Sequence, residues 1–154
     1  MKAALTFTLG LLACSGSVKD IHISLTVSGS LCDAGTLEML GSLSVEVWGA
    51  DAQGGSCRRA RHCVSLSPPM TLMAIEDQLQ AQGQPLLDVA SPGALKIAVV
   101  GYRTPICTSI GDVGALLCGV ADISTASAGR LPIPVRCKTT FGTECAGTVV
   151  PACP

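Results

Sequence analysis

The chain has 154 residues, of which 48% are hydrophobic and 14% are charged, and its formal net charge is −1. This composition excludes an intrinsically disordered protein, because disorder requires low hydrophobicity and a high net charge. A nearly neutral chain also has no electrostatic field that would steer it onto nucleic acid, so no nucleic-acid partner is expected.

The first residues have the pattern of a bacterial export signal. Lys2 gives a positive start, and residues 3–12 form an apolar stretch that is interrupted only by threonine and glycine. A stretch of this length suits the core of a signal peptide and is too short to span a bilayer. We therefore expect residues 1–13 to be removed as a signal and residues 14–154 to form a single domain.

The signal ends in Leu11-Leu12-Ala13-Cys14, which resembles the lipobox of bacterial lipoproteins. The resemblance implies that the chain is cut before Cys14 and that lipid on this cysteine holds the mature protein to a membrane. Ser15 implies the outer membrane under enteric-type sorting rules. Ala13-Cys14-Ser15 also resembles a small-x-small signal peptidase site, and cleavage after Ser15 would release a soluble secreted protein.

Beyond the signal, the first half of the chain shows strands and one helix. Apolar and polar residues alternate with a period of two, which predicts strands with one buried face, over residues 21–28, 43–48 and 59–66. The alternation places Trp48 on the polar face of its strand. From Met70 to Gln82 the residue types favour a helix, with apolar residues at helical spacing.

The second half is predicted to contain further short strands, over residues 86–90, 94–100, 115–123 and 131–137. Residues 94–100 are apolar apart from Lys96, as expected of a central strand that is covered on both faces. The last strand contains Pro132 and Pro134, which cannot donate to a ladder, so we expect it at a sheet edge. The tail beyond Lys138 is expected to be an irregular loop that disulfides tie back.

Six or seven short strands with turns between them, together with one short helix, predict a mainly β fold. The expected architecture is a disulfide-stabilised, immunoglobulin-like Greek-key β-sandwich. The arrangement of the chain, in which a short lipobox signal precedes one cysteine-bearing sandwich domain, resembles that of single-domain lipoproteins of GC-rich Gram-negative bacteria, myxobacteria among them. That resemblance implies no activity.

The chain has nine cysteines, and an odd number in an exported protein leaves one to explain. If Cys14 carries lipid, eight remain for the disulfides expected in an oxidising compartment. These eight are Cys32, Cys57, Cys63, Cys107, Cys118, Cys137, Cys145 and Cys153. Eight cysteines allow on the order of a hundred pairings, so the sequence does not fix the pattern. Proximity favours Cys57 with Cys63 and Cys107 with Cys118.

The segment between Cys57 and Cys63 is the cluster that most suggests ligand binding. Its arginines, Arg58, Arg59 and Arg61, present planar forks of donors that suit a phosphate, a sulfate or a carboxylate sugar. The alternative is a disulfide-closed turn that enters a strand whose arginines lie in water. The neutral overall field favours this second interpretation.

No catalytic residue, metal site or cofactor is predicted. The sequence has no C-x-x-C pair, no G-x-S-x-G or H-E-x-x-H motif and no glycine-rich phosphate loop. The two histidines, His22 and His62, each lie within a strand pattern of their own. Glu76 and Asp77 are adjacent on the predicted helix, where they are expected to point apart into solvent.

The sequence therefore predicts a lipid-anchored, non-catalytic binding or structural module of the cell envelope, on the outer membrane or the periplasmic face. Its partners would be the membrane, through lipid on Cys14, and an unidentified envelope protein or glycan. Two alternatives stay open. One is a soluble, secreted, disulfide-rich protein. The other is an extracytoplasmic hydrolase without a recognisable motif, which would need a pocket that brings His22 or His62 against a serine or aspartate.

Overall fold

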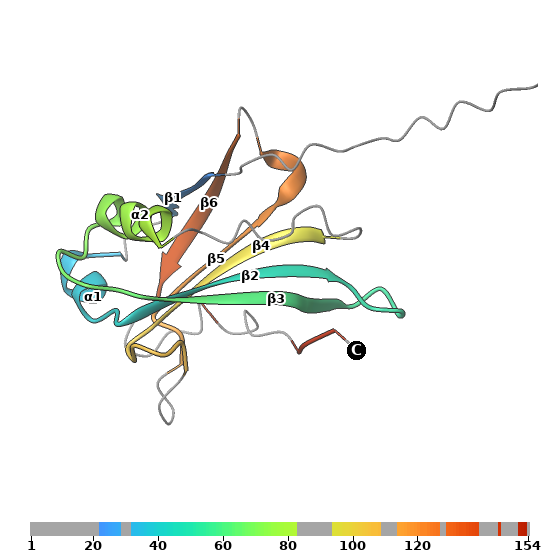
Figure 1. Ribbon diagram of the computed structural model, residues 1–154, viewed down its shortest axis with the longest axis horizontal. Helices are drawn as coiled ribbons and strands as arrows, with labels where there is room; N and C mark the ends of the chain where they lie inside the picture. Colours follow the sequence, from blue (N-terminus) through green and yellow to red (C-terminus); the bar gives the residue numbers. More distant parts are fainter. Residues whose placement is uncertain are drawn as a thin grey trace, which may run out of the picture.

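A computed structural model describes residues 22–28, 32–82, 94–108, 114–126, 129–138, 145 and 151–153. The protein is mainly β, as predicted. Its elements are, in chain order, β1 (His22–Val27), α1 (Ala34–Glu38), β2 (Ser42–Ala50), β3 (Ser56–Ser65), α2 (Leu72–Ala81), β4 (Ala94–Tyr102), β5 (Leu117–Asp122), the 3-10 helix η1 (Ile123–Thr125) and β6 (Arg130–Cys137) (Figure 1). The strand predicted over residues 86–90 lies outside the described residues.

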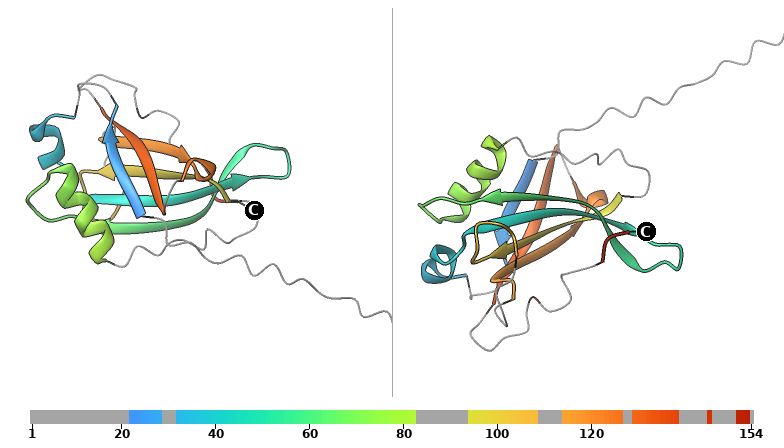
Figure 2. Two further views of the ribbon diagram at one scale, coloured as in Figure 1. Left: turned by 90° about the horizontal axis from the view of Figure 1, so that it is seen from above. Right: turned by 60° about the horizontal axis from the view of Figure 1, so that its bottom comes forward.

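The six strands form one mixed sheet in the order β1-β6-β5-β4-β2-β3. Neighbouring strands in the sheet run antiparallel, except that β1 and β6 run parallel to each other. The sheet is strongly twisted, so that β1 and β6 cross the direction of β2 and β3 at a steep angle (Figure 2). The two-sheet Greek-key sandwich is not confirmed, because the described strands lie in a single sheet.

The predicted helix over residues 70–82 is confirmed as α2. Thr71 caps its N-terminus, since the Thr71 hydroxyl accepts a hydrogen bond of 3.1 Å from the backbone N–H of Ala74. Ile75 and Leu79, one turn apart, are fully buried. They belong to the main core, which is the cluster of buried side chains between α2 and the sheet that includes Leu43, Val45, Ile97, Leu131 and Ile133. There they lie with Ile23 and Leu25 of β1 and with the inward residues of β6. No helix within the described ranges is long and apolar enough to cross a membrane.

The prediction that β2 has one solvent-facing side is wrong. Every residue from Ser42 to Gly49 is buried. Leu43, Val45 and Val47 face the main core. The alternate residues lie on the other face of the sheet, beside a second core made of Val100, Tyr102, Cys107, Ala115, Cys118 and Cys145. Trp48 therefore lies on the polar side of its strand, as predicted, yet only 7% of it is exposed.

The prediction that the proline-containing strand lies at an edge is also wrong, because β6 lies between β1 and β5. The residues of β6 that bond β1 are alternate ones, since Gly129 and Val135 accept from His22 and Ser28. The backbone nitrogens of Pro132 and Pro134 therefore face β5, the neighbour on the other side. The β5–β6 ladder stops at Gly119↔Val135, before the prolines, so no ladder donor is missing. Gly119 permits the close approach there, because a Cβ on it would lie 2.7 Å from the carbonyl oxygen of Pro134.

The eight cysteines from Cys32 onward form four disulfides, namely Cys32–Cys137, Cys57–Cys153, Cys63–Cys107 and Cys118–Cys145. The pairings favoured by proximity are wrong. Cys57 and Cys63 lie on the same extended strand, β3, where six steps of about 3.3 Å separate them far beyond disulfide reach. Cys118 is paired with Val100 inside the sheet, whereas Cys107 lies in the loop after β4 and reaches β3 instead.

The disulfides hold the second core against the sheet. Cys63–Cys107 ties the loop after β4 to β3, and Cys118–Cys145 ties the tail to β5. Residues 151–153 lie beside β3, on the side away from α2 in Figure 1, where Cys57–Cys153 fixes them. Arg58 exchanges backbone hydrogen bonds there with Pro151 and Cys153. The predicted tie of the tail by disulfides is confirmed for these residues.

Candidate functional site

Two arginines of β3, Arg58 and Arg61, face a buried carboxylate that the sequence pattern did not point to. Glu46 of β2 is 1% exposed and lies opposite Arg61 in the β2–β3 register. Its Oε1 atom is 3.6 Å from Nη1 of Arg58 and 3.4 Å from Nε of Arg61. A buried charge requires such partners, because its desolvation would otherwise cost several kcal/mol.

The neighbours of Glu46 on its own strand complete this network. Trp48 Nε1 donates to Glu46 Oε2 at 3.1 Å, and the hydroxyl of Ser44 donates to Oε1 at 3.4 Å. Arg61 also donates to the carbonyl of Cys107 and lies 5.6 Å from the centre of the Tyr102 ring, within cation–π range. The network thus joins β2 and β3 to the end of β4 and the loop that follows it.

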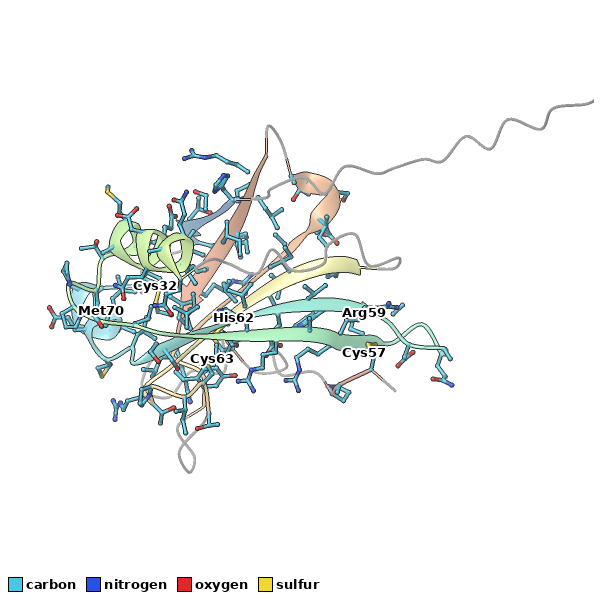
Figure 3. The ribbon with its side chains drawn as sticks, viewed as in Figure 1. Cys32, Cys57, Arg59, His62, Cys63 and Met70 are labelled. Carbon is cyan, nitrogen blue, oxygen red and sulfur yellow. A yellow bond between two sulfur atoms is a disulfide. The ribbon has the colours of Figure 1, made fainter. Side chains whose placement is uncertain are left out.

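These contacts give two of the three candidate ligand-binding arginines a partner inside the protein. The guanidinium groups of Arg58 and Arg61 point at Glu46, and their side chains are only 24% and 31% exposed. Arg59 is exposed and lies at the β3 bulge, where the β2–β3 register shifts (Figure 3). Arg58 and Arg61 are therefore internal counter-charges, neither fully solvated nor assembled as an anion-binding fork.

A pocket of about 360 Å³ lies elsewhere, between the edge strand β1 and the helix α2. Ile23 and Met73 contribute apolar surface to it. Its polar lining consists of His22, Ser24, Glu76, Asp77, Gln80 and Arg130. His22, Glu76 and Asp77, which lie in two separate segments of the sequence, are thus brought together around one pocket.

Simple periodicities place these side chains around one space. On α2, Met73, Glu76, Asp77 and Gln80 are spaced by three or four residues, so they form one stripe beside the buried Ile75 and Leu79. On β1, His22 and Ser24 alternate with the buried Ile23 and Leu25. Arg130 is the register partner of His22 on the neighbouring strand β6. The helical stripe was readable from the sequence, but the strand that faces it was not.

Glu76 also closes the free edge of the sheet. His22 and Ser28 donate toward β6, so the alternate N–H groups of β1 point away from the sheet. The carboxylate of Glu76 accepts one of these, the N–H of Leu25. The expectation that Glu76 is solvated is therefore wrong, because it is half-buried against β1. Asp77 is exposed, as expected, but it lines the same pocket.

The histidines differ in their surroundings. His62 is half-buried on β3, opposite Val45 of β2 (Figure 3). His22 shares the pocket with Ser24 and Asp77, yet within the described part of the chain no hydrogen bond or ion pair joins it to a serine or a carboxylate.

Among all the residues that the structure describes, no group of three or more His, Cys, Asp or Glu side chains is placed to hold a metal ion. Cys14 lies outside the described residues.

Comparisons with protein-family models, with curated proteins and with solved structures find no match to this chain.

Proposed function

We propose that this chain is an exported envelope protein that lipid on Cys14 holds to a membrane, and that its folded part is a non-catalytic binding or structural module. The observation that carries the proposal is the use of cysteine. Every cysteine from Cys32 to Cys153 has a disulfide partner. Disulfides at this density are compatible with an extracytoplasmic location, because the cytosol keeps thiols reduced.

The pairing of the other eight leaves Cys14 as the odd cysteine of the chain. An unpaired thiol would be a liability in an oxidising compartment, since it can exchange with the disulfides. Acylation removes that thiol. The lipobox-like residues before Cys14 supply the route, and two or more acyl chains are enough for stable membrane attachment.

The pocket between β1 and α2 supports a binding role for the folded part. It gathers charged and amide side chains around one space, on elements that the main core holds rigid. A hydrolase stays the alternative. This alternative would require His22 to activate the Ser24 hydroxyl or to work together with Asp77. The wild-type protein would then show a hydrolytic activity that the His22→Ala variant lacks.

Membrane partitioning of wild-type protein and the Cys14→Ser variant, both produced in the native host, tests the anchor. We expect the wild-type protein to stay in the membrane fraction after a high-salt wash and to move into detergent. The Cys14→Ser variant should lack acyl mass and lose this detergent partitioning. Ser15→Ala is the matched control and should behave as the wild type. Equal partitioning of the wild type and Cys14→Ser would overturn the proposal, and a soluble wild-type product would favour the secreted alternative.

A further inference from the structure

We infer that the pocket between β1 and α2 binds a small zwitterion, such as a free amino acid or a short peptide with both termini unblocked. The inference rests on the proposed binding role and names the class of ligand. Its ammonium group would lie against Glu76 and Asp77 of α2. Its carboxylate would lie against Arg130 of β6, with His22 beside it.

The pocket holds polar groups with unused hydrogen-bonding capacity. Within the described ranges, the side chains of His22, Asp77, Gln80 and Arg130 make no hydrogen bond or ion pair with another residue. Arg58 and Arg61, by contrast, are occupied by the buried Glu46. The donors and acceptors around this pocket are therefore available to a ligand.

Negative and positive side chains lie on different walls of the pocket. The carboxylates come from the helix wall, and the guanidinium comes from the strand wall. They line one pocket without forming an ion pair within 4.0 Å, as far as the described residues extend. A ligand that carries both charges can satisfy the two walls together, whereas an anion or a cation alone would face one wall of like charge.

One carboxylate of the helix wall is already held in place. Glu76 is half-buried, and one of its oxygens accepts the N–H of Leu25. This bond holds the carboxylate at the wall, which reduces the entropy lost when a ligand binds. The second oxygen of Glu76 has no hydrogen-bond partner among the described residues.

The volume of the pocket and its apolar lining restrict the class of ligand further. A pocket of about 360 Å³ is near the lower end of the range for small-molecule sites, roughly 300 to 1,000 Å³. Among the described residues no Phe, Tyr or Trp lines it, so they provide no platform of the kind on which sugars stack. Met73, a flexible apolar side chain that is 73% exposed, can cover the side chain of a small amino acid.

The test is a titration of the mature protein, with its disulfides intact, by alanylalanine with free termini, followed by amide NMR shifts and calorimetry. We expect saturable shifts at β1 and α2. Blocking either terminus of the dipeptide, by acetylation or by amidation, should weaken binding roughly tenfold or more, because each block removes a charge-assisted contact.

Two pocket variants and two matched controls complete the design. Asp77→Asn and Arg130→Gln should each weaken binding of the free dipeptide roughly tenfold, because each removes one charge from a wall. Asp122→Asn and Arg136→Gln change exposed residues of the same types outside the pocket and should bind as the wild type. All four positions are exposed, so folding should be kept, which near-UV circular dichroism checks.

Absence of shifts at millimolar dipeptide would overturn the inference, as would equal binding of the blocked dipeptides. Such a result leaves the acyl mass on Cys14 unchanged, so the proposed envelope role would stand. Conversely, a mature protein without lipid that still binds the dipeptide would refute the membrane anchor and keep the pocket.

Discussion

At the scale of single residues, Glu46 explains why an arginine-rich strand lies in a protein of nearly neutral charge. Its carboxylate is buried, and Arg58, Arg61, Trp48 and Ser44 all direct polar atoms at it. Burying a charge is favourable only when partners replace the water that it loses. Arg58 and Arg61 are therefore structural counter-charges of the buried Glu46.

This role predicts a large effect for Glu46→Gln, which keeps the shape and removes the charge. Arg58 and Arg61 would then lie partly buried without a counter-charge, and we expect the free energy of unfolding to fall by about 2 to 4 kcal/mol. Urea unfolding with the disulfides intact measures this change. Asp122→Asn is the control, since Asp122 is exposed and its side chain caps nothing. If Glu46→Gln were as stable as the control, the network would have no structural role.

Asp33 gives a prediction about pH. The backbone N–H of Thr36 donates to the Asp33 carboxylate at 2.7 Å, and this bond, with a further one from the Thr36 side chain, holds the pKa of Asp33 below its usual value. A carboxyl group whose pKa is lower in the folded state stabilises the fold above its unfolded pKa. That contribution is lost as the pH falls through the folded pKa. An NMR titration of the Asp33 side chain should show the lowered pKa, and Thr36→Pro, which removes the N–H donor, should raise it.

At the scale of elements, the sequence predicted what local periodicity controls. The spacing of Leu72, Ile75 and Leu79 gave α2, and the apolar run of residues 94–100 gave the central strand β4. Contacts between distant segments were not predictable in this way. Period-two alternation shows that Glu46 and Trp48 share a face, but it does not show that the loop after β4 covers that face.

The prolines of β6 illustrate the same limit. They exclude hydrogen bonds on one side of the strand, which is why an edge position was expected. A short ladder to β5 satisfies this requirement equally well inside the sheet. The pocket was missed for a related reason, because its two walls come from β1 and α2, which are about 50 residues apart in the chain.

The edge of β1 carries a prediction about α2. Glu76→Ala removes the acceptor of the Leu25 N–H, so hydrogen exchange at the Leu25 amide should become roughly tenfold faster or more. Glu76→Gln keeps an oxygen acceptor and should restore most of the protection. Asp77→Ala, the neighbouring substitution on α2, should leave Leu25 unchanged. Unchanged exchange in Glu76→Ala would mean that the helix does not close the sheet edge through this bond.

At the scale of the whole molecule, the disulfides link parts of the chain that are distant in sequence. Cys32–Cys137 and Cys57–Cys153 span 105 and 96 residues, and the two shorter bridges fasten the second core to the sheet. The sequence showed that an odd number of cysteines leaves one unpaired. It did not show which cysteines pair, because the pairing depends on the order of the strands in the sheet. With the eight paired, Cys14 is the odd cysteine of the chain, and we propose that it carries lipid.

The most direct test is mass spectrometry of the protein purified unreduced from its native membrane, followed by peptide mapping. We expect a mature chain that begins at an acylated Cys14 and has lost two hydrogens for each of the four disulfides. The linked cysteines should be Cys32 and Cys137, Cys57 and Cys153, Cys63 and Cys107, and Cys118 and Cys145. A product that keeps residues 1–13 and has free thiols would contradict it.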